Sequence, residues 1–176
     1  MPVYEIDSHI PDIAPSAFIA PNATIVGQVT IASHASVWFN SVIRADYEKI
    51  TIGAGSNVQD LTMCNADTGK PLNIGKGVTI GHNCVIHGCT IEDDCLIGMG
   101  VVIMNGAIIK KGSLIAAGSL ILENTIIPEN SLVTGSPGKI KKTLDKGAVE
   151  LIHASSDIYK DRAVGYKTPE IFKRCK

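Results

Sequence analysis

The sequence is poor in aromatic residues, which make up 5% of its 176 positions and include a single tryptophan. Apolar residues nevertheless account for 45% of the chain, and 17 positions are glycine. This composition argues against a globular core built around large rings. It favours many thin layers of isoleucine and valine. The length corresponds to one domain with a small appendage.

Cysteine is also scarce, the chain has no long apolar run, and its net charge is small. The five cysteines form no Cys-x-x-Cys pair and are too few for a disulfide-stapled secreted fold. No run of about 18 apolar residues occurs, and the opening residues MPVYEIDSHI contain no apolar signal segment. We therefore expect a cytoplasmic protein that does not bind membranes. A net charge of −1 argues against a dedicated nucleic-acid binder.

A six-residue repeat runs through most of the chain. Its apolar positions are Ile19, Ile25, Ile31, Val37, Ile43, Ile52, Val58, Cys64, Ile74, Ile80, Ile86, Ile91, Ile97, Ile103, Ile109, Ile115, Ile121, Ile127 and Val133. A small or β-branched residue stands four places after most of them. Neither a helix of period 3.6 nor simple strand alternation keeps this register. The pattern predicts a parallel β-helix of hexapeptide repeats.

The repeat resembles the left-handed, triangular kind of β-helix, in which three hexads make one coil. We therefore predict an all-β fold, a single-stranded left-handed parallel β-helix of about six coils over residues 19–137. Residues 1–18 are expected to form an extended cap. Residues 138–176 should contain a C-terminal α-helix and a tail, because apolar residues recur at helical spacing from Leu144 to about Val164.

Three segments interrupt the repeat. Arg44–Lys49 is rich in charge, Asn65–Asn73 is rich in turn-forming residues, and His87–Thr90 is one residue short. Segments that leave a rigid scaffold often carry function. The polar residues around them are therefore the candidates for chemistry.

Three polar motifs occur in a fixed order: Arg44-Ala45-Asp46, Gln59-Asp60, and His82 followed by His87-Gly88. Two histidines five residues apart can each supply a neutral imidazole to zinc. This constellation resembles the γ-class carbonic anhydrases and their hexapeptide-repeat relatives, and the resemblance extends from Ile19 to about Pro137. It implies a homotrimer with zinc, or iron or another divalent metal, bound between subunits.

The resemblance also implies roles for individual residues. His87 would face the ion on one subunit, and His82 would reach it from the neighbouring subunit. Arg44 and Asp60 would form a pair across the interface. The residues expected to act on water or bicarbonate near the metal are Asp46, Gln59 and, from the C-terminal helix, Tyr159.

Residue 65 departs from the family pattern. Asn65 stands where the family has its first zinc histidine, and an amide oxygen is a poorer zinc ligand than nitrogen or sulfur. It follows Cys64 in the repeat as His87 follows Ile86, so the two side chains should project alike. The sequence thus predicts a metal site with ligands His82, His87 and Asn65 that is degraded at one position.

Three functions remain open. The first is reversible hydration of carbon dioxide by a metal-bound hydroxide. The second is acyl transfer from acyl-CoA, with His82, His87 or His34 as general base. The third is a non-catalytic trimeric assembly protein that has kept the scaffold and lost a ligand.

Overall fold

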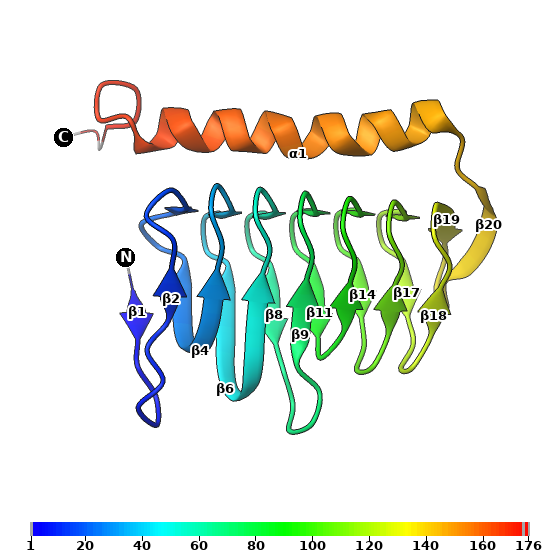
Figure 1. Cartoon of the computed structure of the whole chain (residues 1–176), viewed down its shortest axis with the longest axis horizontal. Helices are drawn as coiled ribbons and strands as arrows, with labels where there is room; N and C mark the ends of the chain where they lie inside the picture. The colour runs from blue at the N-terminus through cyan, green and yellow to red at the C-terminus, as the bar shows by residue number, and fades with distance from the viewer. Residues whose placement is uncertain (1, 174, 176) are drawn as a thin grey trace.

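The repeats build a parallel β-solenoid of about seven turns with one C-terminal helix along its side (Figure 1). The computed structural model describes residues 2–173 and 175. The predicted hexapeptide-repeat β-helix is confirmed. Its cross-section has three walls, wall one to wall three, and each is defined by the strands that form it.

Wall one contains β1 (Val3–Tyr4), β8 (Met63–Asn65), β11 (Val85–His87), β14 (Val102–Ile103) and β17 (Leu120–Ile121). Wall two contains β2 (Asp12–Ile13), β9 (Leu72–Ile74), β12 (Thr90–Ile91), β15 (Ile108–Ile109) and β18 (Ile126–Ile127). Two long strands, β4 (Thr24–Ile31) and β6 (Val42–Ile52), bend from wall one into wall two. These two walls therefore form one continuous sheet.

Wall three is a separate sheet. It contains β3 (Phe18–Ile19), β5 (Ser36–Val37), β7 (Asn57–Val58), β10 (Thr79–Ile80), β13 (Leu96–Ile97), β16 (Leu114–Ile115), β19 (Ser131–Thr134) and β20 (Lys139–Thr143). The last strand, β20, runs antiparallel to β19 and was not predicted. It pairs with the edge that the final turn would otherwise expose, and an unpaired edge is a site of aggregation.

The two ends of the chain extend the repeat. The structure has about seven turns rather than six, because residues before Ile19 also pair with the solenoid. β1 and β2 both lie parallel to β4, so the N-terminal segment completes an additional turn. Like β20 at the other end, these short strands cover an open sheet edge.

The core is a column of small and branched side chains. The repeat positions from Ile25 to Val133 are at most 2% exposed, as the hexad register requires. Three of the corner positions, Ser56, Thr62 and Ser113, are also buried, and their hydroxyls donate to backbone oxygens of the next turn. Each turn thus buries its apolar layer and satisfies its own corner polar groups.

Helix α1 (Lys146–Lys167) covers wall three, with Asp145 as its N-cap. Six of the eight aromatic residues gather between this helix and the wall or beside them. Trp38 is central, because Phe18, Tyr159 and Tyr166 lie 5.0 to 5.3 Å from it, centroid to centroid. The few large rings therefore dock the helix and leave the solenoid core to aliphatic side chains.

Besides the N-terminal turn between β1 and β2, two turns protrude from the solenoid at the corner between walls one and two (Figure 1). One is the middle of β6, and the other is the loop of residues 66–71 that joins β8 to β9. The backbone N–H of Gly69 donates to Glu48 Oε1 at 3.0 Å, so the two turns support each other. Both coincide with interruptions that the sequence pattern indicates.

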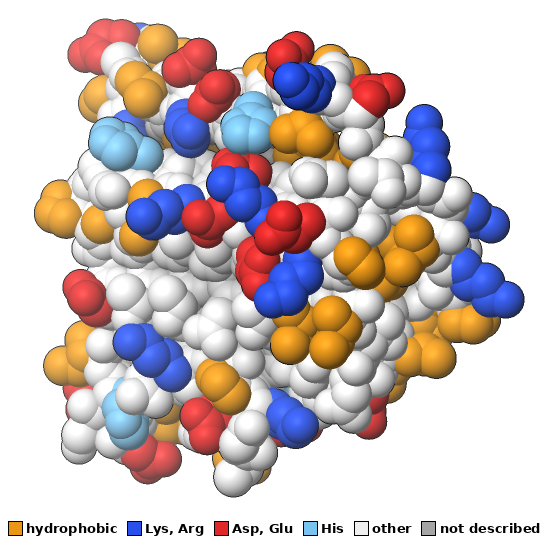
Figure 2. All heavy atoms as spheres, turned by 45° about the vertical axis from the view of Figure 1, so that its right-hand side comes forward, with side chains coloured by type: hydrophobic (Ala, Val, Ile, Leu, Met, Phe, Trp, Pro, Cys, Tyr) orange, Lys and Arg blue, Asp and Glu red, His pale blue; other side chains and the backbone are white. Residues whose placement is uncertain are grey.

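No helix in the described part of the chain is long and apolar enough to span a membrane. Figure 2 shows basic and acidic side chains interspersed over one face, with apolar patches between them. Some charged side chains of the solenoid are paired: Lys110 binds Glu92 at 2.7 Å, and Lys111 binds Asp94 at 3.3 Å.

Candidate functional site

The residues singled out in the sequence fall into two groups within one chain. The first group lies on wall one, where Arg44 pairs in register with Asn65 and Asn65 pairs with His87. These three residues therefore stack on consecutive turns and project in the same direction. The register agrees with the expectation that Asn65 and His87 project alike.

The Asn65 side chain is oriented by its neighbours. Its Nδ2 donates to the backbone oxygen of Arg44 at 2.5 Å and lies 3.4 Å from Oδ1 of Asp46. Arg44 forms an ion pair with Asp46 and also donates from Nη2 to Asn65 Oδ1 at 3.1 Å. Because its NH₂ group is engaged there, Asn65 presents Oδ1 to His87 Nε2, which lies 3.2 Å away.

The second nitrogen of the His87 ring also faces an oxygen. Nδ1 lies 2.8 Å from Oδ1 of Asn105, and Asn105 Nδ2 donates to Asp67 Oδ2 at 2.9 Å. Asn105 is on the next turn, and Asp67 belongs to the protruding loop of residues 66–71. His87 is thus held between two amide oxygens from neighbouring turns.

The second group lies where helix α1 meets the corner between walls three and one. His82 Nδ1 lies 2.9 Å from Asp60 Oδ2, while Asp60 Oδ1 accepts the backbone N–H of Phe39 at 3.2 Å. The carboxylate is held from two sides, so it fixes the orientation of the imidazole. His82 Nε2 is left to face away from Asp60.

This second group borders a pocket of about 380 Å³. Its lining residues are Trp38, Phe39, Asp60, His82, Ile158, Tyr159, Arg162 and Tyr166. Burial, and then the negative charge of Asp60, raise the pKa of Tyr159, while Arg162 acts in the opposite direction. The phenol therefore stays protonated at neutral pH and is a hydrogen-bond donor.

Gln59 is buried beside this group. Its Nε2 donates to Asn57 Oδ1 at 3.1 Å, and Asn57 Nδ2 donates to Thr79 Oγ1 at 3.0 Å. The chain of amides holds Gln59 in one orientation, and none of the residues that the structure describes forms a hydrogen bond with its Oε1. Asp46, the other residue expected to order water, belongs to the first group and lies apart from Gln59 within one chain.

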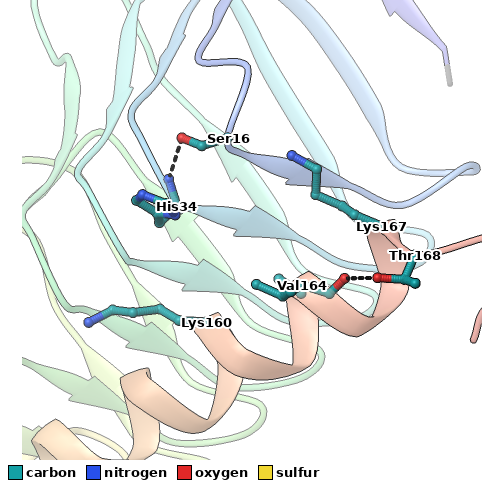
Figure 3. A pocket seen from close by; sticks show the side chains of 7 residues that line it. Ser16, His34, Lys160, Val164, Lys167 and Thr168 are labelled. Carbon is teal, nitrogen blue, oxygen red and sulfur yellow. Dashed lines mark hydrogen bonds between the residues drawn. The ribbon is translucent and has the colours of Figure 1, made fainter.

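His34 lies away from both groups. It lines a pocket of about 280 Å³ between the first turns and α1, together with Ser16, Lys160 and Lys167 (Figure 3). Its backbone N–H donates to Ser16 Oγ at 3.1 Å, and no carboxylate is among the lining residues. This arrangement lacks the oriented acid partner that Asp60 provides for His82.

Cys64, next to Asn65, points into the core and is fully buried. Burial raises the pKa of its thiol well above the usual range, so the thiol is a protonated part of the core.

The two histidines have different partners within one subunit: Asp60 for His82, and Asn65 and Asn105 for His87. His82 lies in the turn that precedes β11, whereas His87 is the last residue of β11. In the described residues, no three His, Cys, Asp or Glu side chains gather around one point. Within one chain the candidate residues therefore form two separate groups.

Asn105, Asp67 and Asn57 were not found from the sequence. A signal existed for Asn105, because it follows His87 by 18 residues, which is one coil of three hexads. Asp67 could not be found in this way, because its loop departs from the repeat.

The architecture defines a hexapeptide-repeat solenoid whose polar residues form two separate groups. Comparisons with known proteins agree with this class. Residues 71–105 and 88–123 match the family described as bacterial transferase hexapeptide (six repeats). A hexapeptide transferase family protein from Anaplasma phagocytophilum is 35% identical, with 94% of this chain and 98% of that chain covered and a TM-score of 0.91. The chain therefore belongs to the hexapeptide transferase family.

Two further relatives differ in their assigned activities. A Bacillus cereus protein proposed to be an acetyltransferase is 38% identical, with 94% of this chain and 96% of that chain covered and a TM-score of 0.92. A carbonic anhydrase from Geobacillus kaustophilus is 41% identical over 43% of this chain and 41% of its own length. The matched part of this chain spans about two fifths of the length of the curated relatives.

Proposed function

We propose that the chain is a γ-carbonic anhydrase-like protein that assembles as a homotrimer and binds a divalent metal between subunits. His87 and Asn65 of one subunit and His82 of a neighbour would hold the ion. The reaction proposed for the site is reversible hydration of carbon dioxide. Partial matches to proteins named carbonic anhydrase support this reading.

The observation that carries the proposal is the shared orientation of the two histidines. In each ring, Nδ1 faces an oxygen acceptor: Asp60 for His82 and Asn105 for His87. Histidines that bind metals typically donate their other ring N–H to a carboxylate or carbonyl oxygen. Both rings can therefore offer Nε2 as a ligand.

The geometry of residue 65 also fits a metal ligand. His87 Nε2 and Asn65 Oδ1 lie 3.2 Å apart. Two ligands of one tetrahedral ion, each at about 2.1 Å, would be about 3.4 Å apart. A carbonyl oxygen has two lone pairs, so Asn65 can accept from Arg44 and still face an ion. When the lone pairs of His87 Nε2 and Asn65 Oδ1 point toward each other, they favour a cation between them.

The outer surface of wall one supports assembly. Val42, Met63, Val85, Val102 and Leu120 stand side by side along it, and Val85 is 41% exposed. An apolar column beside an incomplete ligand set suits contact with a neighbouring subunit. A cyclic trimer would join the His87 half-site of each subunit to the His82 half-site of the next.

A bound divalent ion would supply the Lewis acidity that makes water nucleophilic at neutral pH. The chain's own residues would act around it. Asp46 would accept a hydrogen bond from water, and its ion pair with Arg44 holds its carboxylate in place. Gln59 would direct Oε1 toward the same water from the neighbouring subunit. The expected pair between Arg44 and Asp60 across subunits stays a prediction, because within one chain they have other partners.

The test combines mass, metal content and turnover. Light scattering should give three times 18.6 kDa in micromolar solution. Protein purified without oxygen and loaded with Zn²⁺, Fe²⁺ or Co²⁺ should bind about one ion per subunit and hydrate carbon dioxide in stopped-flow assays. A monomer, or a trimer that binds none of these metals, would contradict the proposal.

Acyl transfer is the second candidate function, and the Asp60–His82 pair favours it. A histidine whose Nδ1 is held by a carboxylate can act as a general base through Nε2. This pair borders an aromatic-lined pocket within a single chain. Acetyl-CoA should then raise the melting temperature of the metal-free protein, and an absence of any shift would argue against this alternative.

A further inference from the structure

We propose that Asn105 and Asp67 are positioning residues that set the tautomer of His87, and so keep its Nε2 free of a proton. The consequence for metal binding rests on the function proposed above. The position of the proton, however, can be measured on metal-free protein. Neither residue belongs to the polar motifs that point to a metal site.

Two amide oxygens compete for the single N–H of a neutral His87 ring. Asn105 Oδ1 lies 2.8 Å from Nδ1, and Asn65 Oδ1 lies 3.2 Å from Nε2. The shorter contact is in the favoured range for a hydrogen bond, whereas the longer one is at its outer limit. The proton is therefore expected on Nδ1, which leaves a lone pair on Nε2 facing Asn65.

Asp67 decides which end of the Asn105 amide faces His87. An amide has one accepting end and one donating end, and rotation by 180° exchanges them. If Asn105 turned, its NH₂ group would face Nδ1 and the ring proton would move to Nε2. A carboxylate can only accept, so the 2.9 Å bond from Asn105 Nδ2 to Asp67 opposes this rotation.

The surroundings of Asn105 hold this chain of contacts in place. The loop that carries Asp67 is closed by a backbone bond from Lys70 to Asp67 at 2.8 Å and by the contact between Gly69 and Glu48. Gly88, at φ +48°, leaves the space that Asn105 occupies, since a Cβ there would overlap Asn105 Oδ1. The loop of residues 66–71 is thus connected to His87 through the side-chain amide of Asn105.

The direct test is nitrogen NMR of the imidazole rings in metal-free protein, at an alkaline pH at which the spectra show neutral rings. His87→Gln assigns the His87 signals among the five histidines. Wild type should carry the proton on Nδ1. Asn105→Leu should move it to Nε2, where Asn65 accepts it, whereas Asn105→Asp combined with Asp67→Asn, which exchanges the amide and the carboxylate, should leave it on Nδ1.

Two more variants sharpen the test. Asp67→Asn should give a mixture of both tautomers, because an amide at position 67 can bond either end of Asn105. Asn65→Leu is the matched control and should leave the proton on Nδ1. An Nε2 proton in wild type, or no change in both Asn105→Leu and Asp67→Asn, would overturn the proposal. Asp67 is exposed, so its variant supplies the test if Asn105→Leu does not fold.

Calorimetric titration of the metal-free proteins with Zn²⁺ then tests the consequence. Asn105→Leu and Asp67→Asn should weaken binding by roughly 10-fold to 100-fold, as is typical when the hydrogen-bond partner of a metal ligand is changed, and Asn105→Asp combined with Asp67→Asn should bind like wild type. If wild type binds no metal while the tautomer shifts as expected, the proposed function fails and the positioning role stands. If the metal binds but the tautomer is unaffected, the positioning role fails alone.

Discussion

Residues 91–133 and residues 42–90 follow the same repeat but use it differently. In the first region, every strand except the last, β19, is two residues long, and paired positions are 18 residues apart, as in Leu96 with Leu114. The second region contains the 11-residue β6 and the loop of residues 66–71, and paired positions there are as far as 22 residues apart. Most of the candidate site lies in this second, irregular region.

The difference separates stability from chemistry. In the regular region, each hexad adds one buried apolar residue and one corner whose polar group is hydrogen-bonded. A substitution at either position therefore disturbs the packing of the core. In the irregular region, added residues move polar side chains to the corners, where they meet side chains of neighbouring turns. Substitutions in residues 91–133 should therefore change unfolding, and substitutions in residues 42–90 should change metal binding.

The largest effect is expected from His82→Ala. It removes one of two imidazole ligands, so bound metal should fall below detection in elemental analysis. The side chain is 42% exposed, so the free energy of unfolding should change by less than about 1 kcal/mol. Retention of about one ion per subunit would remove His82 from the site.

The next effect is a gain from Asn65→His. An imidazole nitrogen in place of the amide oxygen should complete three firm ligands, raise the zinc content and increase or create carbon dioxide hydration. The variant loses the Nδ2 bond to the Arg44 backbone, so a stability cost of about 1 kcal/mol is expected.

Asn65→Gln, which keeps an amide, should show no gain and serves as the control for Asn65→His. His82→Ala combined with Asn65→His should again lack metal. If Asn65→His gains neither metal nor activity, residue 65 does not face the ion, and the non-catalytic assembly function would become the leading hypothesis.

Ser119→Leu, in the regular region, should lower stability clearly and leave metal binding unchanged. Ser119 is 1% exposed, and its Oγ accepts the Gly135 N–H at 3.2 Å. Leucine should overpack this corner by about 1–3 kcal/mol, measured by urea unfolding, without changing metal content. Ser119→Ala, which removes only the hydroxyl, should cost about 1 kcal/mol.

The smallest effect is expected from Lys111→Ala on the same part of the solenoid. Lys111 is 58% exposed, and its contact with Asp94 is a surface ion pair. Such pairs contribute little, so the free energy of unfolding should change by no more than about 0.5 kcal/mol. Equal changes in melting temperature for Lys111→Ala and Ser119→Leu would mean that the hexad register is wrong.

The repeat, read from the sequence alone, determined the fold. Each hexad specifies its own inward residue and corner, so local spacing predicts burial from Ile25 to Val133. Spacing within one turn also predicted that Asn65 and His87 would project alike. Strand β20 was beyond this reasoning, because Lys139–Thr143 has no repeat and pairs only because the last turn leaves an edge.

The tertiary structure alone decided how the site residues are oriented. Asp60 with His82, Asn65 with His87, and Asp67 with Asn105 are separated by about 20 to 40 residues and meet only when turns stack. Which nitrogen of an imidazole is free depends on the oxygen that the other nitrogen faces, and no local pattern records that contact. The repeat therefore determined which residues reach the surface, and the stacking of turns decided which atoms they present.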